Sequence, residues 1–288
     1  MKAQVWDARR CVLGEGPVVR GSEVFWVDIL GKRVLSRSIE SEQITEFDTH
    51  DHVSFVLPRA GGELMLGIAD GPYLRNVEGV LRRLPGRVEA DGHDDPNPTR
   101  WNDAKVSPTG ETWLGSMTYD VLPHEAALYR LSQDGTSIKR MLSDVTLSNG
   151  LGWSRDGTRF FYIDTPTRRV DVFDASVKGI TNRRTFIDLS ATTGMPDGLA
   201  VDAEDGVWVA FWDGGAVRRY DGQTGVLTAQ IDLPVPRVTS CAFVGPDFDQ
   251  LVITTARADQ PSGDVAESGM TFIAQPEISG LPTWFFAE

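Results

Sequence analysis

The sequence contains few cysteines and no long hydrophobic run. Cys11 and Cys241 are the two cysteines of its 288 residues, too few for a disulfide framework or a thiolate zinc cluster, so we expect two buried free thiols. No apolar run approaches the roughly 18 residues that span a bilayer, and residues 1–7 lack the apolar core of a signal peptide. These absences predict a cytoplasmic protein that does not enter a membrane.

Basic residues are scarce relative to acidic ones. The 28 Lys and Arg residues face 41 Asp and Glu residues, which gives a net charge of −13 at pH 7. Because basic contacts to phosphate supply most nucleic-acid affinity, a chain this acidic is poorly suited to nucleic acid or to an anionic membrane surface. The ordinary apolar fraction of 41% indicates a globular chain. We therefore expect neither nucleic acid nor a membrane as partner, and we also expect a monomer or weak homo-oligomer.

Helical periodicity is also scarce, whereas short alternating segments are frequent. No stretch of about 11 residues shows the apolar spacing of an amphipathic helix. Six segments are rich in β-branched and aromatic residues and are bounded by Gly, Pro, Asp or Ser, which favours strands. They are residues 24–27, 63–67, 112–115, 160–163, 206–210 and 250–254.

A weak repeat organises these strands. The copies start at residues 15, 53, 102, 149, 197 and 239, so neighbouring starts are 38 to 49 residues apart. A period near 45 residues built from strands is typical of a β-propeller, in which each blade must stack on its neighbours to bury both faces. The sequence therefore predicts an all-β, six-bladed β-propeller with four-stranded antiparallel blades around a central channel, as one domain over residues 1–288. A β-sandwich and a seven-bladed ring with one degenerate blade are the alternatives.

The ends of the chain are expected to meet. Residues 3–9 form an additional strand before the first repeat. We expect this strand to pair with residues 268–273 in the last blade, because that pairing closes the ring and removes an open sheet edge.

The first strand of each blade lines the channel of a propeller, so residues at equivalent repeat positions converge there. These positions hold two carboxylates and two amides among Glu15, Val53, Asn102, Asn149, Asp197 and Thr239. Two neighbouring unpaired carboxylates are strongly disfavoured, and a bound cation removes the conflict. Oxygen ligands favour Ca²⁺, followed by Mg²⁺ or Mn²⁺. The alternative is that the Asn-Gly and Asp-Gly pairs are only turns.

Four short motifs carry a resemblance to a known family. Residues 13–17 (Leu-Gly-Glu-Gly-Pro), 100–103 (Arg-Trp-Asn-Asp), 148–151 (Ser-Asn-Gly-Leu) and 196–199 (Pro-Asp-Gly-Leu) occur in the order and spacing of the regucalcin/gluconolactonase family, which includes senescence marker protein and bacterial sugar lactonases. The resemblance covers about residues 11–257. It implies a carboxylic ester hydrolase that converts a sugar lactone, gluconolactone first, to the aldonic acid.

The resemblance also implies a cofactor and its ligands. One divalent cation is expected in the channel, held by Glu15, Asn149 and Asp197. Ca²⁺ is the first candidate, and Zn²⁺, Mn²⁺, Mg²⁺ and Fe²⁺ are the others. Asp197 is also the expected general base, because a carboxylate beside the metal can accept a proton from water.

The expected substrate contacts come from the third repeat. The resemblance assigns them to Arg100 and Asn102, and a further acidic contact falls at Asp120. Residues 118–120 read Thr-Tyr-Asp and lack the Glu pair that the family usually has there. An alternative for Arg100 is a channel arginine paired with Asp103 or Asp197.

Two other functions are compatible with such a propeller. Related propellers with a channel calcium hydrolyse phosphotriesters, and a non-catalytic propeller can serve as a calcium-binding or docking scaffold. Three further features lie near the expected site: His52, which could reach the channel mouth from the second blade; Trp101, which could line the pocket; and residues 91–99, either a lid or a surface loop.

Overall fold

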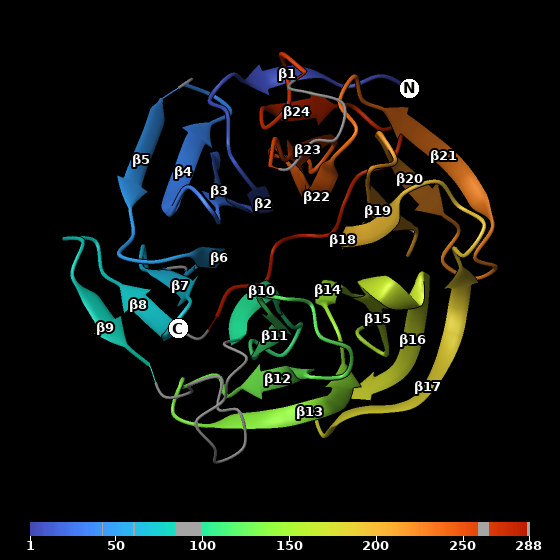
Figure 1. Ribbon diagram of the computed structural model, residues 1–288, viewed down its shortest axis with the longest axis horizontal. Coiled ribbons are helices and arrows are strands. Elements are labelled where there is room, and N and C mark those ends of the chain that lie inside the picture. Colours follow the sequence, from blue (N-terminus) through green and yellow to red (C-terminus); the bar gives the residue numbers. More distant parts are fainter. Residues whose placement is uncertain (42, 60, 85–98, 259–264, 287–288) are drawn as a thin grey trace.

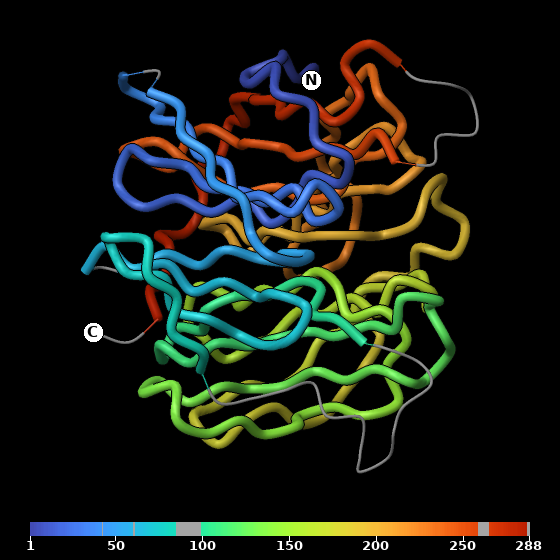
Figure 2. The backbone as a smooth tube through the Cα atoms, turned by 60° about the vertical axis from the view of Figure 1, so that its left-hand side comes forward, coloured from blue at the N-terminus to red at the C-terminus, as the bar shows by residue number. Residues whose placement is uncertain are grey.

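The computed structural model describes residues 1–41, 43–59, 61–84, 99–258 and 265–286. Six four-stranded sheets surround a central axis like the blades of a propeller (Figure 1). In the turned view the blue start of the chain lies beside its orange and red end in the upper part, with the green and yellow blades below (Figure 2). The predicted six-bladed β-propeller is confirmed. Residues 91–98, part of the segment expected to be either a lid or a surface loop, lie outside the described residues.

In the first five blades the strands follow one another from the channel outward. The first blade consists of β2 (Gly14–Arg20), β3 (Glu23–Asp28), β4 (Arg33–Ser38) and β5 (Ile44–Asp48). The second consists of β6 (Val53–Pro58), β7 (Leu64–Ile68), β8 (Gly71–Arg75) and β9 (Leu81–Arg83). The third consists of β10 (Thr99–Val106), β11 (Thr112–Thr118), β12 (Ala126–Leu131) and β13 (Ile138–Val145).

The remaining blades complete the ring. The fourth consists of β14 (Ser148–Trp153), β15 (Arg159–Asp164), β16 (Arg169–Ser176) and β17 (Gly179–Asp188), with a short 3-10 helix η1 (Thr165–Thr167) between β15 and β16. The fifth consists of β18 (Met195–Val201), β19 (Val207–Trp212), β20 (Ala216–Tyr220) and β21 (Leu227–Asp232). The sixth consists of β22 (Val238–Val244), β23 (Gln250–Thr255), β24 (Thr271–Ala274) and β1 (Gln4–Asp7).

The sixth blade joins the two ends of the chain. Its outermost strand is β1, which pairs antiparallel with β24, so that Gln4 lies opposite Ile273. The predicted extra strand is therefore confirmed. This pairing closes the ring non-covalently and protects the edge of β24. Within the described part of the chain, no helix has the length and apolar character needed to cross a bilayer.

Every innermost strand contains an irregularity near the predicted channel positions. The pairing between the first and second strands shifts register in all six blades. The shifts fall at Glu15/Val18, Val53/Val56, Trp101/Ala104, Asn149/Leu151, Pro196/Leu199 and Val238/Ser240. A bulge of this kind bends a strand and re-aims its side chains, and bulges are common beside active sites.

The apolar cores lie between neighbouring blades, and one predicted pocket residue belongs to them. Trp101 is completely buried among Phe55 and Leu114, and its ring meets Tyr129 edge to face with centroids 5.6 Å apart. The prediction that Trp101 lines the pocket is therefore wrong. Successive side chains of a strand point to opposite faces, so Trp101 points away from the side shared by its neighbours. Both cysteines are buried free thiols, as predicted.

The C-terminal segment, residues 276–286, crosses the channel; we call it the strap (Figure 1). Gly280 bridges to Asp202 of the fifth blade and donates to the Phe248 carbonyl, and Phe286 packs into the core between the second and third blades. Asp202 directly follows β18, whereas Asp197 lies near its start. The strap therefore crosses the end of the channel opposite Asp197.

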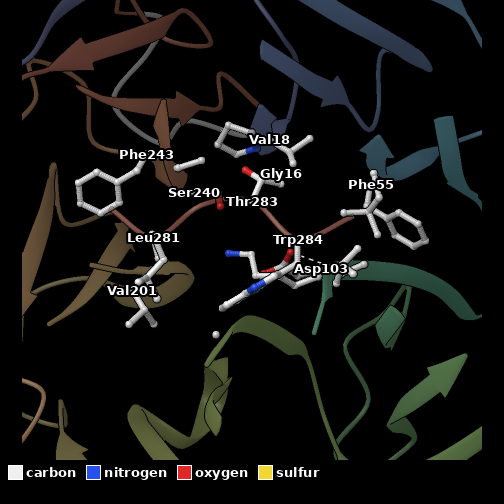
Figure 3. Close-up of a pocket in the computed structure, with 18 of the residues that line it drawn as sticks. Gly16, Val18, Phe55, Asp103, Val201, Ser240, Phe243, Leu281, Thr283 and Trp284 are labelled. Carbon is white, nitrogen blue, oxygen red and sulfur yellow. Dashed lines mark hydrogen bonds between the residues drawn. The ribbon is translucent and has the colours of Figure 1, made fainter. Parts of the chain in front are cut away.

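A cavity of about 100 Å³ lies under the strap. Leu281, Thr283 and Trp284 cover it, and the ends of the inner strands surround it (Figure 3). Asp103 and Lys105 of β10 also line this cavity. Leu281, Thr283 and Trp284 of the strap thus cover the end of the channel opposite Asp197.

Candidate active site

The bulges bring two acidic side chains together in the channel. Glu15 comes from β2 and Asp197 from β18. Burial, followed by repulsion from Asp197 and Asp103, raises the pKa of Glu15 well above its ordinary value. Burial and repulsion from Asp103 likewise raise the pKa of Asp197. Glu15 and Asp197 therefore lie together in the channel, and Glu15 acts on Asp197 through a hydrogen bond that opposes the rise in its pKa. A positive charge beside them would relieve the repulsion that raises the pKa of Glu15.

Asn149 of β14 is held in place by a hydrogen-bond chain that joins the fourth and fifth blades. Thr165 Oγ1 donates its single proton to the Pro196 carbonyl at 2.9 Å, so it can only accept from Asn149 Nδ2, which lies 3.0 Å away. One N–H of the Asn149 amide is thereby committed to Thr165. The Asn149 side chain also lies beside Asp197, where its hydrogen bond opposes the rise in the pKa of Asp197.

Two buried oxygen atoms in this cluster have no hydrogen-bond partner. They are Asn149 Oδ1 and Asp197 Oδ1. An unpaired buried oxygen costs about 1–3 kcal/mol, and most such atoms in proteins are satisfied. Together with the Glu15 carboxylate they form a donor set made only of oxygen, which fits a hard divalent cation. Among the described residues no cluster of three His, Cys, Asp or Glu side chains could hold a metal, so this set depends on the amide oxygen.

The strands that carry Glu15 and Asn149 are fixed in the same way. Asp28, at the end of β3, accepts from the backbone N–H of Leu13 at 3.0 Å, just before β2 begins. Asp164, at the end of β15, accepts from the backbone N–H of Leu147 at 2.9 Å, just before β14 begins. A buried carboxylate that ties down the preceding residue fixes where each inner strand enters the channel.

Arg100 lies beside the carboxylates in a fixed orientation. Its Nη1 donates to Asn102 Oδ1 at 2.9 Å, to the Trp101 carbonyl at 2.8 Å and to Ser54 Oγ at 3.3 Å. Burial lowers the pKa of Arg100 to about 10, opposed by the charges of Glu15 and Asp197, so the guanidinium stays charged at neutral pH. No ion pair joins Arg100 to Asp103 or Asp197, both of which the structure describes.

Both ends of the Asn102 side-chain amide form hydrogen bonds within the protein. Its Oδ1 accepts from Arg100, and its Nδ2 donates to the Ser148 carbonyl at 2.9 Å. The Ser148 carbonyl belongs to the fourth blade, so Asn102 links two blades and holds the guanidinium in place. In this arrangement Asn102 is a positioning residue for Arg100.

The third predicted substrate contact is not brought to this cluster. Asp120 is exposed in the turn after β11, and its assignment stays a prediction. Its neighbour Tyr119 instead lies against His52, with Tyr119 Oη 3.0 Å from His52 Nδ1. His52 therefore lies beside the mouth of the channel, close enough to Arg100 to be influenced by its charge.

Sequence reasoning missed three contributors to the site. Ser54 is one residue beyond the predicted channel position Val53, and its displacement comes from the bulge between Val53 and Val56. Thr165 follows β15 without any local motif. Burial raises the pKa of Asp103. The sequence indicates Asp103 only as an alternative partner for Arg100, whereas in the structure its charge raises the pKa of both Glu15 and Asp197.

A six-bladed propeller with an acidic, oxygen-lined site in its channel defines a recognisable class of protein. Residues 13–257 match the family described as SMP-30/Gluconolactonase/LRE-like region. The chain belongs to this family, which confirms the resemblance seen in the sequence motifs.

Relatives along nearly the whole chain support this assignment. Regucalcin of Danio rerio is 37% identical over 284 residues, covering 95% of this chain and 94% of that protein. Pentonolactonase XacC of Haloferax volcanii is 32% identical over 295 residues, covering 94% of both. The solved structure of regucalcin from Agrobacterium tumefaciens, described as a calcium-binding protein, has a TM-score of 0.91 at 27% identity and covers 99% of this chain and 97% of its own.

Proposed function

We propose that this protein hydrolyses a neutral sugar lactone, with gluconolactone as the first candidate, to the aldonic acid in a reaction that depends on one divalent cation. Membership of a family named for gluconolactonase and similarity to a pentonolactonase support this reaction. The substrate is then a small uncharged molecule with several hydroxyl groups and one strained or activated ester.

One structural observation supports the proposal most directly. The half-buried Glu15 lies with the buried Asn149 and Asp197, two oxygen atoms of this cluster lack hydrogen-bond partners, and a fixed guanidinium lies beside it. A scaffold needs no such arginine. A hydrolase uses it to bind the oxygen on which negative charge develops.

Glu15, Asn149 and Asp197 would hold the cation. Their oxygen atoms favour Ca²⁺, while Zn²⁺, Mn²⁺, Mg²⁺ and Fe²⁺ stay candidates because carboxylates bind them too. When bound, the cation would polarise the lactone carbonyl and acidify water.

Asp197 and Arg100 would transfer the proton and stabilise the developing negative charge. Asp197 would accept a proton from the attacking water as its oxygen bonds to the lactone carbonyl carbon. Arg100 would donate to the carbonyl oxygen as it becomes an oxyanion, with Asn102 holding the guanidinium. Collapse of the intermediate breaks the ring C–O bond, and the proton on Asp197 passes to the departing ring oxygen.

A pH-stat assay over a panel of aldonolactones tests this function. We expect acid release that stops after chelation and returns on adding one divalent metal, while circular dichroism shows the same β-structure throughout. Activity that is indifferent to chelator would contradict the metal dependence. Turnover of a phosphotriester but of no lactone would favour the phosphotriesterase alternative, and calcium binding without any turnover would favour the scaffold.

A further inference from the structure

A chain of polar contacts runs along the channel mouth, outside the residues assigned above. Lys32 Nζ donates to Asp51 Oδ1 at 2.9 Å, the same oxygen accepts from the His52 backbone N–H at 2.9 Å, and His52 Nδ1 lies 3.0 Å from Tyr119 Oη. We call these four residues the rim. Lys32 lies between β3 and β4, Asp51 and His52 precede β6, and Tyr119 follows β11. The rim therefore spans three consecutive blades.

The rim lies next to Arg100. Tyr119 follows Met117 by two residues, and Met117 is the direct cross-strand partner of Arg100. His52 precedes Ser54 by two residues, and Ser54 Oγ accepts from Arg100 Nη1 at 3.3 Å. Two contacts thus join the second and third blades, one in the channel through Arg100 and one at the mouth through Tyr119.

The turn that carries Tyr119 is held in an unusual conformation. Val121 and His124 have positive φ angles of 52° and 67°, which for a β-branched residue costs on the order of 1–3 kcal/mol. Leu122 N–H donates to Thr118 Oγ1 at 2.7 Å, and His124 Nδ1 lies 2.8 Å from Asp144 Oδ1. Strain of this kind persists only where other contacts fix the backbone, and it clusters at ligand sites.

The rim has balanced charge and presents neutral hydrogen-bonding groups. Lys32 and Asp51 neutralise each other in an ion pair. Burial lowers the pKa of His52 below 6.5 and raises the pKa of Tyr119 above 10, so both rings are uncharged at pH 7. Two polar aromatic rings of this kind suit a neutral polyhydroxylated ligand rather than an ion.

We propose that Tyr119 and His52 form the specificity-determining wall of the substrate site and limit the length of the carbon chain attached to the lactone ring. Their two rings, with centroids 5.7 Å apart, bridge the second and third blades beside Arg100. A lactone bound at Arg100 would place its exocyclic carbons against them. The wall favours five-carbon 1,4-lactones over six-carbon 1,4-lactones, which carry one more exocyclic carbon. This inference rests on the proposed lactonase function.

The Tyr119→Ala variant tests the wall. The measured quantity is the ratio of kcat/KM for a hexono-1,4-lactone to that for a pentono-1,4-lactone. Because one carbon in a shaped pocket changes kcat/KM by about 10–200-fold, we expect the ratio to rise at least tenfold. Tyr119→Phe keeps the ring and loses the contact with His52, so it should retain most of the preference and also serves if the Ala variant folds poorly.

A second Tyr–His pair provides the matched control. His50 and Tyr73 of the second blade have ring centroids 5.6 Å apart, and Tyr73 Oη donates to Asp70 Oδ2 at 2.7 Å. Tyr73→Ala removes the same atoms without touching the rim, so the ratio should stay at the wild-type value. An equal change in both Ala variants would overturn the proposal.

Binding of unreactive alditols separates this inference from the lactonase proposal. Calorimetry with a five-carbon and a six-carbon alditol measures chain-length preference without turnover. If the wild type hydrolyses no lactone but Tyr119→Ala shifts the alditol preference, the lactonase proposal fails and the wall stands. If lactones are hydrolysed and neither ratio shifts, the wall is wrong. Wild-type protein that neither hydrolyses lactones nor binds alditols contradicts both.

Discussion

At the scale of single residues, hydrogen bonds to the backbone decide which atoms are left for chemistry. Thr165 accepts one N–H of Asn149 and fixes that amide, whose oxygen has no hydrogen-bond partner. Asn102, by contrast, uses both ends of its amide inside the protein. Two asparagines at similar repeat positions therefore have different roles: one is a candidate ligand, and the other holds a guanidinium.

Arg100→Lys separates substrate binding from metal binding. Lysine keeps the charge but loses the planar fork that contacts Asn102, Trp101 and Ser54. We expect kcat/KM for the best lactone to fall by roughly ten- to a thousandfold, or about 1.4–4 kcal/mol, with metal affinity changed only severalfold. Lactonase kinetics beside calorimetric metal titration check this, and Arg184→Lys in an exposed ion pair is the control. Loss of the metal would make Arg100 structural.

Glu15→Gln should stabilise the metal-free protein while weakening metal binding. The folded state raises the pKa of Glu15 and Asp197, so it holds protons that the unfolded chain has released. Stability without metal therefore falls as pH rises from the unfolded pKa values of about 4 toward the raised folded values. The variant removes one of the two charges, so we expect a gain of about 1–2 kcal/mol at pH 8.

Urea denaturation in chelator at pH 5 and pH 8 measures this difference, with the exposed Glu40→Gln as the control. Substituting a residue that only supports a metal ligand lowers metal affinity by roughly 10–100-fold. Because Glu15 is itself a candidate ligand, the metal affinity of Glu15→Gln should fall by more than that. Equal stability of wild type and variant at both pH values would show that Glu15 is not a repelled, buried carboxylate.

The sequence motifs predict the side chains that form the polar cluster in the channel, but not the side chains that orient them. Glu15, Arg100, Asn149 and Asp197 follow from motifs in register, and the structure brings them together. Thr165 acts through a hydroxyl in the fourth blade whose partner is a backbone carbonyl of the fifth. A contact of that kind depends on how two blades stack, which no local pattern records.

At the scale of elements, the strap covers the end of the channel opposite Asp197. Gly280 is fixed by the fifth and sixth blades, and Phe286 by the core between the second and third, so the strap ties opposite sides of the ring together. Trp284 packs against two of the apolar clusters on the way. The strap therefore adds contacts between blades that are distant in sequence.

Phe286→Ala should detach the end of the strap without affecting the site. Phe286 is 3% exposed, and truncating a buried Phe costs about 3–5 kcal/mol, or less where a chain end can come away. We expect the urea midpoint to fall clearly while metal affinity stays at the wild-type value, because the strap lies at the opposite end of the channel. Val226→Ala, at a residue 60% exposed, should change neither. A parallel loss of metal affinity would contradict the separation of strap and site.

Elements with strong local signals were predictable, and those defined by long-range contacts were not. Alternating apolar segments bounded by turn residues predict the second strand of each blade. The extra segment before the first repeat predicts β1 and its pairing with the last blade. The strap has no strand pairing or repeat of its own. The repeat position predicts Val53 at the channel, whereas the structure uses Ser54, because a bulge between Val53 and Val56 shifts the register there.

At the scale of the whole molecule, the ring gives residues distant in sequence a common centre. Each inner strand contacts those of the two neighbouring blades, so Glu15 and Asp197 meet although 182 positions separate them. The packing between blades supplies the large apolar core. The site can therefore contain repelling carboxylates and unpaired oxygen atoms, because the apolar core offsets the stability that they cost.

The most direct test of the account is anomalous diffraction from crystals soaked in Mn²⁺. The account predicts one strong peak in the channel, within about 2.0–2.6 Å of the Glu15 carboxylate, Asn149 Oδ1 and the Asp197 carboxylate, and its disappearance in Asp197→Ala crystals. Absence of a peak at that position in the wild type, or a peak that persists in the variant, would contradict the central claim.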